Sequence, residues 1–301
     1  PASCTGGGAS VPGTSDIAIF DPDCDNGATI DTNWSVIGIN INSGYTGTVT
    51  QASTRTLTVG TSDYIQAGGV FAGGDSTITF SDAVTISAGT FTINDAPVSF
   101  SDASHTVTGS VTFKNTTFNA TGSRTITIAS GTIITVTGTL NITTTGTGTL
   151  TFNTGDIYAQ GDITISSGTG AGGGSATITI NGTVDQTLTG GGTANQGRLP
   201  KININKASGT LYLVSVITVV GSSWTYTQGT IDAGTSTVVF IGLGSSARDI
   251  IGSHTLYNVE FISATNGTET ISSGTILTVN GTLTISGSSN GYNISVGDIY
   301  A

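Results

Sequence analysis

The chain has 301 residues, of which 45 are glycine, only 8% are charged and none is methionine. Soluble domains average about 7% glycine and about 25% charged residues, and disordered chains are poor in the β-branched residues that are frequent here. The composition therefore excludes an average globular domain and a disordered chain, while a net charge of −11 with seven basic residues excludes a surface for nucleic acid phosphates.

The first part of the chain, residues 1–60, differs from the rest in being the least repetitive. Cys4 and Cys24 lie in it, and a disulfide between them is the favoured interpretation, which predicts an extracytoplasmic compartment. Two free buried thiols in a cytosolic protein remain the alternative. The start at Pro1 and the lack of methionine predict a processed, mature chain. We expect this segment to be a disulfide-closed cap that leads into the first strands.

The stretch FDPDCDNG places Asp21, Asp23 and Asp25 at alternate positions before a glycine. Alternating carboxylates that end in glycine can surround a hard cation such as Ca²⁺. The EF-hand pattern requires its glycine one position earlier and a later glutamate, and Pro22 stiffens this loop. The sequence therefore leaves two interpretations, a calcium site or an acidic turn held by Cys24. No other cofactor is predicted.

From residue 61 onward, alternation of apolar and hydroxyl side chains is the dominant pattern, as in STITF (residues 76–80) and SRTITI (residues 123–128). This period of two is typical of half-buried strands. Glycine-containing corners separate the strands, and FSDA recurs at Phe80 and Phe100, a step of 20 residues. The chain is therefore predicted to be an all-β parallel β-solenoid (β-helix) with about 20 residues per coil, roughly 14 coils and essentially no helix. A string of β-sandwiches is the rival fold, which the short, nearly interchangeable strands disfavour.

A longer repeat is superimposed on the coils. SGTIITVTGTL at residues 130–140 matches SGTILTVNGTL at residues 273–283 with an offset of 143, and GDIYA at residues 155–159 recurs at 297–301 with an offset of 142. Upstream, TVVF ending at Phe240 aligns with TITF ending at Phe80 at an offset of 160. The difference predicts that the second copy lacks one coil.

These repeats predict a first module at residues 61–159 and a second at 160–301, stacked as one continuous solenoid. The glycine-rich stretches at residues 166–175 and 190–198 are expected to be loops that project from the solenoid wall. The chain would end at the seam between repeat units, where a longer protein continues or the next subunit docks.

Candidate catalytic residues are few. His105 and His254 both occur in SHT before a predicted strand, and this shared context indicates repeat structure. Asp82 and Asp102 are expected to stack one coil apart, but a repeated corner explains them as well as an acid and base pair does. The sequence therefore predicts a protein that is not an enzyme.

Two long stretches resemble tandem repeats of large bacterial surface proteins. They are VPGTSDIAIFDPDCDNGATID with GININSGYTGTVTQ, and GGGSATITINGTVDQTLTGGGTANQGRLPKININKASGTLYL through WTYTQGTIDAGTSTVVF to SHTLYNVEF. They are similar to adhesin and autotransporter-passenger repeats. The resemblance implies a secreted β-helical fold at the cell surface, and it implies no active-site residue.

The sequence thus predicts a non-enzymatic extracellular structural protein, a subunit of a bacterial surface filament, fibre or layer. It would assemble head to tail through end-to-end contacts between solenoids. Surface glycans are a further expected partner, while nucleic acid and membrane insertion are not expected. An adhesin stalk or a carbohydrate-binding or carbohydrate-cleaving β-helix is the alternative.

Overall fold

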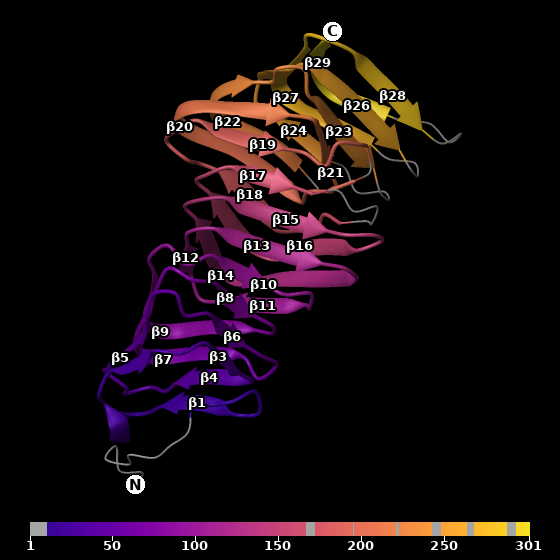
Figure 1. The fold of residues 1–301 in the computed structure, drawn as a ribbon. Coiled ribbons are helices and arrows are strands. Elements are labelled where there is room, and N and C mark those ends of the chain that lie inside the picture. Colours follow the sequence, from indigo (N-terminus) through magenta and orange to yellow (C-terminus); the bar gives the residue numbers. More distant parts are fainter. Residues whose placement is uncertain are drawn as a thin grey trace.

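The computed structural model describes residues 11–166, 172–194, 196–220, 223–242, 248–263, 268–287 and 293–301. The fold is a parallel β-solenoid of about 12 turns with about 22 residues per turn. Its coils stack into an elongated rod with the first and last described strands at opposite ends (Figure 1). The predicted fold class is confirmed, although the coils are longer and fewer than expected because many corners hold more residues than the FSDA step implies. None of the helices in the described part of the chain has the length and hydrophobicity of a membrane span.

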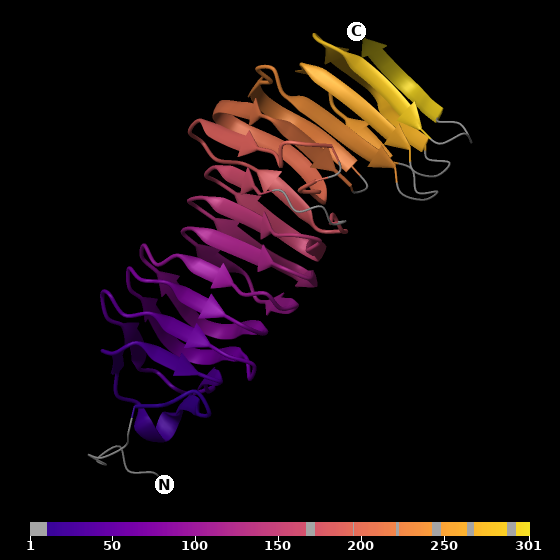
Figure 2. The same ribbon diagram turned by 45° about the vertical axis from the view of Figure 1, so that its right-hand side comes forward.

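The strand pairings divide each coil among three walls, and parallel strands stack along the rod on each wall. Figure 2 shows this stacking from the side. The first wall contains β1 (Ile17–Phe20), β4 (Gly38–Ile41), the first halves of β7 (Tyr64–Gly73) and β9 (Val84–Ile93), β11 (His105–Thr108), the first halves of β14 (Ser123–Val136) and β16 (Thr149–Ala159), β21 (Val216–Val219), β23 (Thr237–Gly242), β26 (Asn258–Ser263) and β28 (Leu283–Gly287).

The second wall contains β2 (Ala28–Ile30), β5 (Thr48–Gln51), the second halves of β7, β9, β14 and β16, β12 (Val111–Phe113), β18 (Thr177–Ile180), the first halves of β20 (Lys201–Val214) and β22 (Ser223–Asp232), β24 (Arg248–Ile251) and the first halves of β27 (Thr268–Val279) and β29 (Asn293–Tyr300).

The third wall contains β3 (Trp34–Val36), β6 (Leu57–Val59), β8 (Ile78–Phe80), β10 (Val98–Phe100), β13 (Thr116–Ala120), β15 (Leu140–Thr144), β17 (Ile163–Ile165), β19 (Gln186–Thr189), the second halves of β20 and β22, β25 (His254–Leu256) and the second halves of β27 and β29. A short 3-10 turn, η1 (Pro22–Cys24), lies between β1 and β2.

Alternation along each strand sends one set of side chains into the rod. In β8 the pattern is buried, intermediate, buried, so Ile78 and Phe80 face inward and Thr79 faces outward. Since parallel strands stack in register, like residues meet from coil to coil, and Phe80 lies under Phe100 as the FSDA step predicts. The Phe100 ring is 4.7 Å from that of Phe118 in the next coil. The core is thus a set of side-chain columns along the axis.

The ladder of the second wall continues across the expected boundary between the two modules. Asp156–Ala159 at the end of β16 pairs in register with Thr177–Ile180 of β18. The division into modules stays a prediction. The first wall is different, because around both glycine-rich stretches it holds only isolated bridges in the described residues, Thr151 to Gly173 and Leu199 to Val219. For this reason β21, β23, β26 and β28 form a separate sheet.

The long repeat does not return to the same wall. From Ile134 on the second wall, six steps through the pairings lead to Ile271 on the same wall, by way of Ile157, Ile178, Ile202, Trp224 and Ile250. The sequence equivalent of Ile134 at an offset of 143 is Leu277, which lies on the third wall and pairs with His254. Over one repeat unit, the chain therefore makes six full turns and then advances by one further wall. Equivalent residues of the two units thus lie on different walls of the rod.

Candidate functional site

The predicted calcium loop lies between β1 and β2, and the carboxylates of Asp21 and Asp25 accept hydrogen bonds from backbone and hydroxyl groups. Asp21 caps η1 by accepting from the Asp23 amide at 3.2 Å. Asp25 accepts from the amide and hydroxyl of Thr46 and from the Gly47 amide in the next coil. These hydrogen bonds, led by the Thr46 hydroxyl, lower the pKa of Asp25.

No group of three or more His, Cys, Asp or Glu side chains in the described ranges is arranged to hold a metal ion. The arrangement of Asp21 and Asp25 favours the acidic turn as the interpretation, and calcium binding stays a prediction. Cys24 ends η1, whereas Cys4 lies outside the described residues, so the disulfide also stays a prediction.

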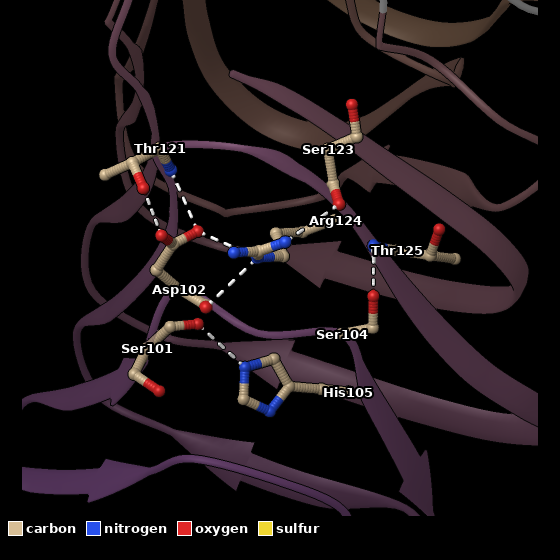
Figure 3. Close-up of polar contacts among 8 residues, drawn as sticks. All are labelled: Ser101, Asp102, Ser104, His105, Thr121, Ser123, Arg124 and Thr125. Carbon is tan, nitrogen blue, oxygen red and sulfur yellow. Dashed lines mark hydrogen bonds and ion pairs between the residues drawn. The ribbon is translucent and has the colours of Figure 1, made fainter.

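The corner after β10 brings Asp102 and His105 close to each other (Figure 3). Asp102 accepts from the Thr121 amide at 2.9 Å, from the Thr121 hydroxyl, and from Arg124 Nε at 2.9 Å. These contacts, led by the Thr121 hydroxyl, lower the pKa of Asp102 to about 2. Since Thr121 and Arg124 belong to the following coil, the corner joins one coil to the next.

His105 lies inside this corner with both ring nitrogens engaged. Its Nε2 faces the Ser101 carbonyl at 2.9 Å and its Nδ1 faces the Asp82 carbonyl at 2.9 Å. The Asp82 carboxylate accepts from the Ala83 amide. Neither nitrogen is directed at solvent, so the geometry assigns these groups to corner structure, while the absence of enzymatic activity stays a prediction.

His254 is not the repeat equivalent of His105. His105 pairs with Ile126 on the first wall, and the residues 143 positions further on, Arg248 and Glu269, pair in the same way on the second wall. The shared SHT letters therefore do not mark equivalent positions of the repeat. His254 lies on the third wall, where Trp224 Nε1 donates to its Nε2 at 3.0 Å. Burial lowers the pKa of His254.

Several polar side chains point into the rod, and the sequence analysis did not predict them. Lys206 is 1% exposed, and its ammonium donates to the carbonyls of Gly182 and Val184 and to Gln186 Oε1 at 2.7, 2.8 and 2.7 Å. Gln186 in turn donates to the Ala159 and Gly161 carbonyls. These side chains supply hydrogen-bond donors to backbone carbonyls at the corners inside the rod. A polar residue at an inward position of an alternating strand, as in KININK, is the signal for them.

Two outer grooves lie where the ladder is interrupted. On the third wall, β22 and β25 share no pairing in their described residues, although β20 pairs with β22 and β25 pairs with β27. A groove of about 480 Å³ opens over this break. Its lining residues are Thr210, Tyr212, Thr230, Ile231, Asp232, Ala233, Gly234, Thr255, Leu256, Tyr257 and Asn280.

The second groove is the counterpart of the first in the other repeat unit. On the second wall, β12 pairs with β14, but β12 and the second half of β9 share no pairing in their described residues. A groove of about 340 Å³ lies there, lined in part by Phe91, Thr112 and Tyr158. The break follows β9 in the first unit and β22 in the second, so these strands are equivalent, and Gly229 corresponds to Gly89 at an offset of 140. This offset is close to the 142 and 143 of the other repeats. The second unit therefore need not lack the coil that the offset of 160 suggested.

No family model, no curated protein and no solved structure matches this chain.

Proposed function

We propose that this protein is a non-enzymatic extracellular structural protein, a subunit of a bacterial surface filament, fibre or layer that assembles through end-to-end contacts between solenoids. The resemblance to adhesin and autotransporter-passenger repeats supports the location. The described fold supports the structural role, since a rod of stacked parallel coils resists bending and extends by adding coils.

The observation that carries the proposal is the last described coil. Ile285 pairs with Phe261, and both occupy an inward position, yet Phe261 is fully buried while Ile285 is 54% exposed. Leu283 and Ile299 occupy inward positions of the same coil and are also partly exposed. Within the described residues, the strands of this coil pair on one side, and its inward side chains are exposed, which favours contact with a further coil. In the proposed assembly, a second copy of the protein supplies that coil.

Negative-stain microscopy of the purified protein over a range of concentrations tests this assembly. We expect rods that lengthen with concentration, and we expect Ile285→Glu to keep them short because a charge would be buried in the contact. Val184→Glu is the matched control, since Val184 is 66% exposed and lies on a corner away from the end. Short, monodisperse rods of the wild-type protein at every concentration would refute end-to-end assembly.

The second candidate function, an adhesin stalk or a carbohydrate-binding protein, is favoured by the groove on the third wall. This function is independent of assembly, because the groove opens on the side of the rod.

A further inference from the structure

The groove between β22 and β25 is a built feature of the repeat. An interruption of the ladder occurs at equivalent places in both units, and each groove contains equivalent residues, Phe91 with Ile231 and Thr112 with Thr255. The corner before each interruption is tight, since a Cβ added at Gly109 or Gly252 would overlap a carbonyl oxygen of the preceding coil. The groove therefore follows from the local sequence of the repeat. It recurs in both units although the equivalent strands lie on different walls of the rod.

The groove on the third wall differs from its counterpart in the side chains it presents. Tyr212 and Tyr257 lie on its two sides and are 38% and 36% exposed. Asp232 is the in-register neighbour of Tyr212 in the next coil. Its Oδ1 accepts from the Gly234 amide at 2.9 Å, and Asn280 is exposed at the rim. Aromatic faces are thus combined with a carboxylate and an amide.

This combination fits a neutral sugar. The C–H face of a pyranose ring packs on an aromatic side chain, and its hydroxyl groups bond to planar carboxylate and amide groups. No lysine or arginine is among the lining residues, which disfavours phosphates and uronates. A volume of about 480 Å³ is within the range of small-molecule sites, roughly 300–1,000 Å³.

The spacing of the two tyrosines suits a chain of sugars. Tyr212 belongs to the coil of β20 and Tyr257 follows β25, two coils further along the axis. Paired strands lie about 4.8 Å apart, and the step from β22 to β25 is unpaired in the described residues. Two coils therefore separate the tyrosines by at least roughly 10 Å along the rod. A pyranose unit is about as long as one coil spacing. We propose that this groove binds a neutral oligosaccharide that lies along the solenoid axis, with sugar rings packed on Tyr212 and Tyr257 and hydroxyl groups bonded to Asp232 and Asn280.

Titration of the intact protein with short cello-, xylo- and chito-oligosaccharides tests the proposal, with saturation-transfer NMR and calorimetry as readouts. We expect at least one series to bind, and we expect Tyr212→Ala and Tyr257→Ala each to raise the Kd about tenfold, the effect of losing one aromatic contact. Tyr300→Ala is the matched control, because Tyr300 is 59% exposed on the same wall outside the groove. Its Kd should equal that of the wild type.

Three results would overturn the proposal. The first is no binding of any neutral oligosaccharide, the second is equal binding by the tyrosine variants, and the third is binding of uronate oligosaccharides alone. Circular dichroism of each variant shows whether it is folded, and Asp232→Asn offers a second test that keeps the shape of the groove. Binding should persist in Ile285→Glu, so a failure of assembly and a failure of glycan binding are distinguishable.

Discussion

Replacing Gly109 by alanine is expected to destabilise the solenoid much more than replacing Gly131 by alanine. Both glycines have positive φ, +89° and +77°, a conformation that L side chains disfavour. They differ in their surroundings. A Cβ at Gly109 would overlap the carbonyl oxygen of Ile86 in the coil below, whereas a Cβ at Gly131 meets no atom of the described residues within 4 Å. Comparing the two variants therefore separates the energetic cost of the backbone conformation from the cost of the contact between coils.

The magnitudes follow from these two terms. The left-handed conformation costs a non-glycine residue roughly 1–2 kcal/mol, and overpacking a close contact costs about 1–3 kcal/mol more. We expect the free energy of unfolding to fall by about 1–2 kcal/mol for Gly131→Ala and by about 2–5 kcal/mol for Gly109→Ala. Urea unfolding followed by circular dichroism measures both.

The second repeat unit offers an independent copy of the experiment. Gly252 has a φ of +85° and its Cβ would overlap the Tyr226 carbonyl oxygen, while Gly274 has a φ of +77° and open space around it. Gly252→Ala should therefore destabilise the protein more than Gly274→Ala. Equal losses within both pairs would show that the corners are not in tight contact and would refute the reasoning.

Three further predictions concern the buried and bonded polar groups. Because burial lowers the pKa of His254 from its usual 6.5, the folded protein binds that proton more weakly than the unfolded chain, and the free energy of unfolding should fall as pH drops below about 6.5. The pKa of Asp102, lowered from 3.8 to about 2, means that its stabilising contacts persist above pH 3.8 and are lost as pH falls toward 2. Lys206→Met should lower the free energy of unfolding by at least about 2 kcal/mol, since it leaves buried acceptors without a donor.

Each of these predictions has a matched control. His254→Leu should flatten the dependence of stability on pH near 6, and an unchanged profile would contradict the assignment. Asp102→Asn should lower the unfolding midpoint at neutral pH, whereas Asp95→Asn should not, because the Asp95 side chain is 77% exposed and 3.7 Å from its cation. Lys201→Met, at a half-exposed position of β20, should be tolerated, and a loss as large as that of Lys206→Met would argue against the buried ammonium.

Much of the fold can be predicted from the sequence because its determinants are local. Alternation tells which side chains face inward, and FSDA places Phe100 over Phe80. The candidate sites are less predictable. The spacing of Asp21 and Asp25 predicts a cation site, but the partners of Asp25, Thr46 and Gly47, lie a coil away and carry no motif.

A glycine-cornered β-solenoid with a repeat of about 142 residues can be predicted from the amino-acid pattern alone. Three features become visible only in the folded chain: the repeat advances by six turns plus one wall, Arg248 and Glu269 form a buried pair at 3.0 Å, and Tyr212 and Tyr257 border one groove. The pattern does not reveal them because all three walls use the same alternating strand. A strand pattern specifies inside and outside, whereas the wall on which it lies depends on the number of residues in every preceding corner.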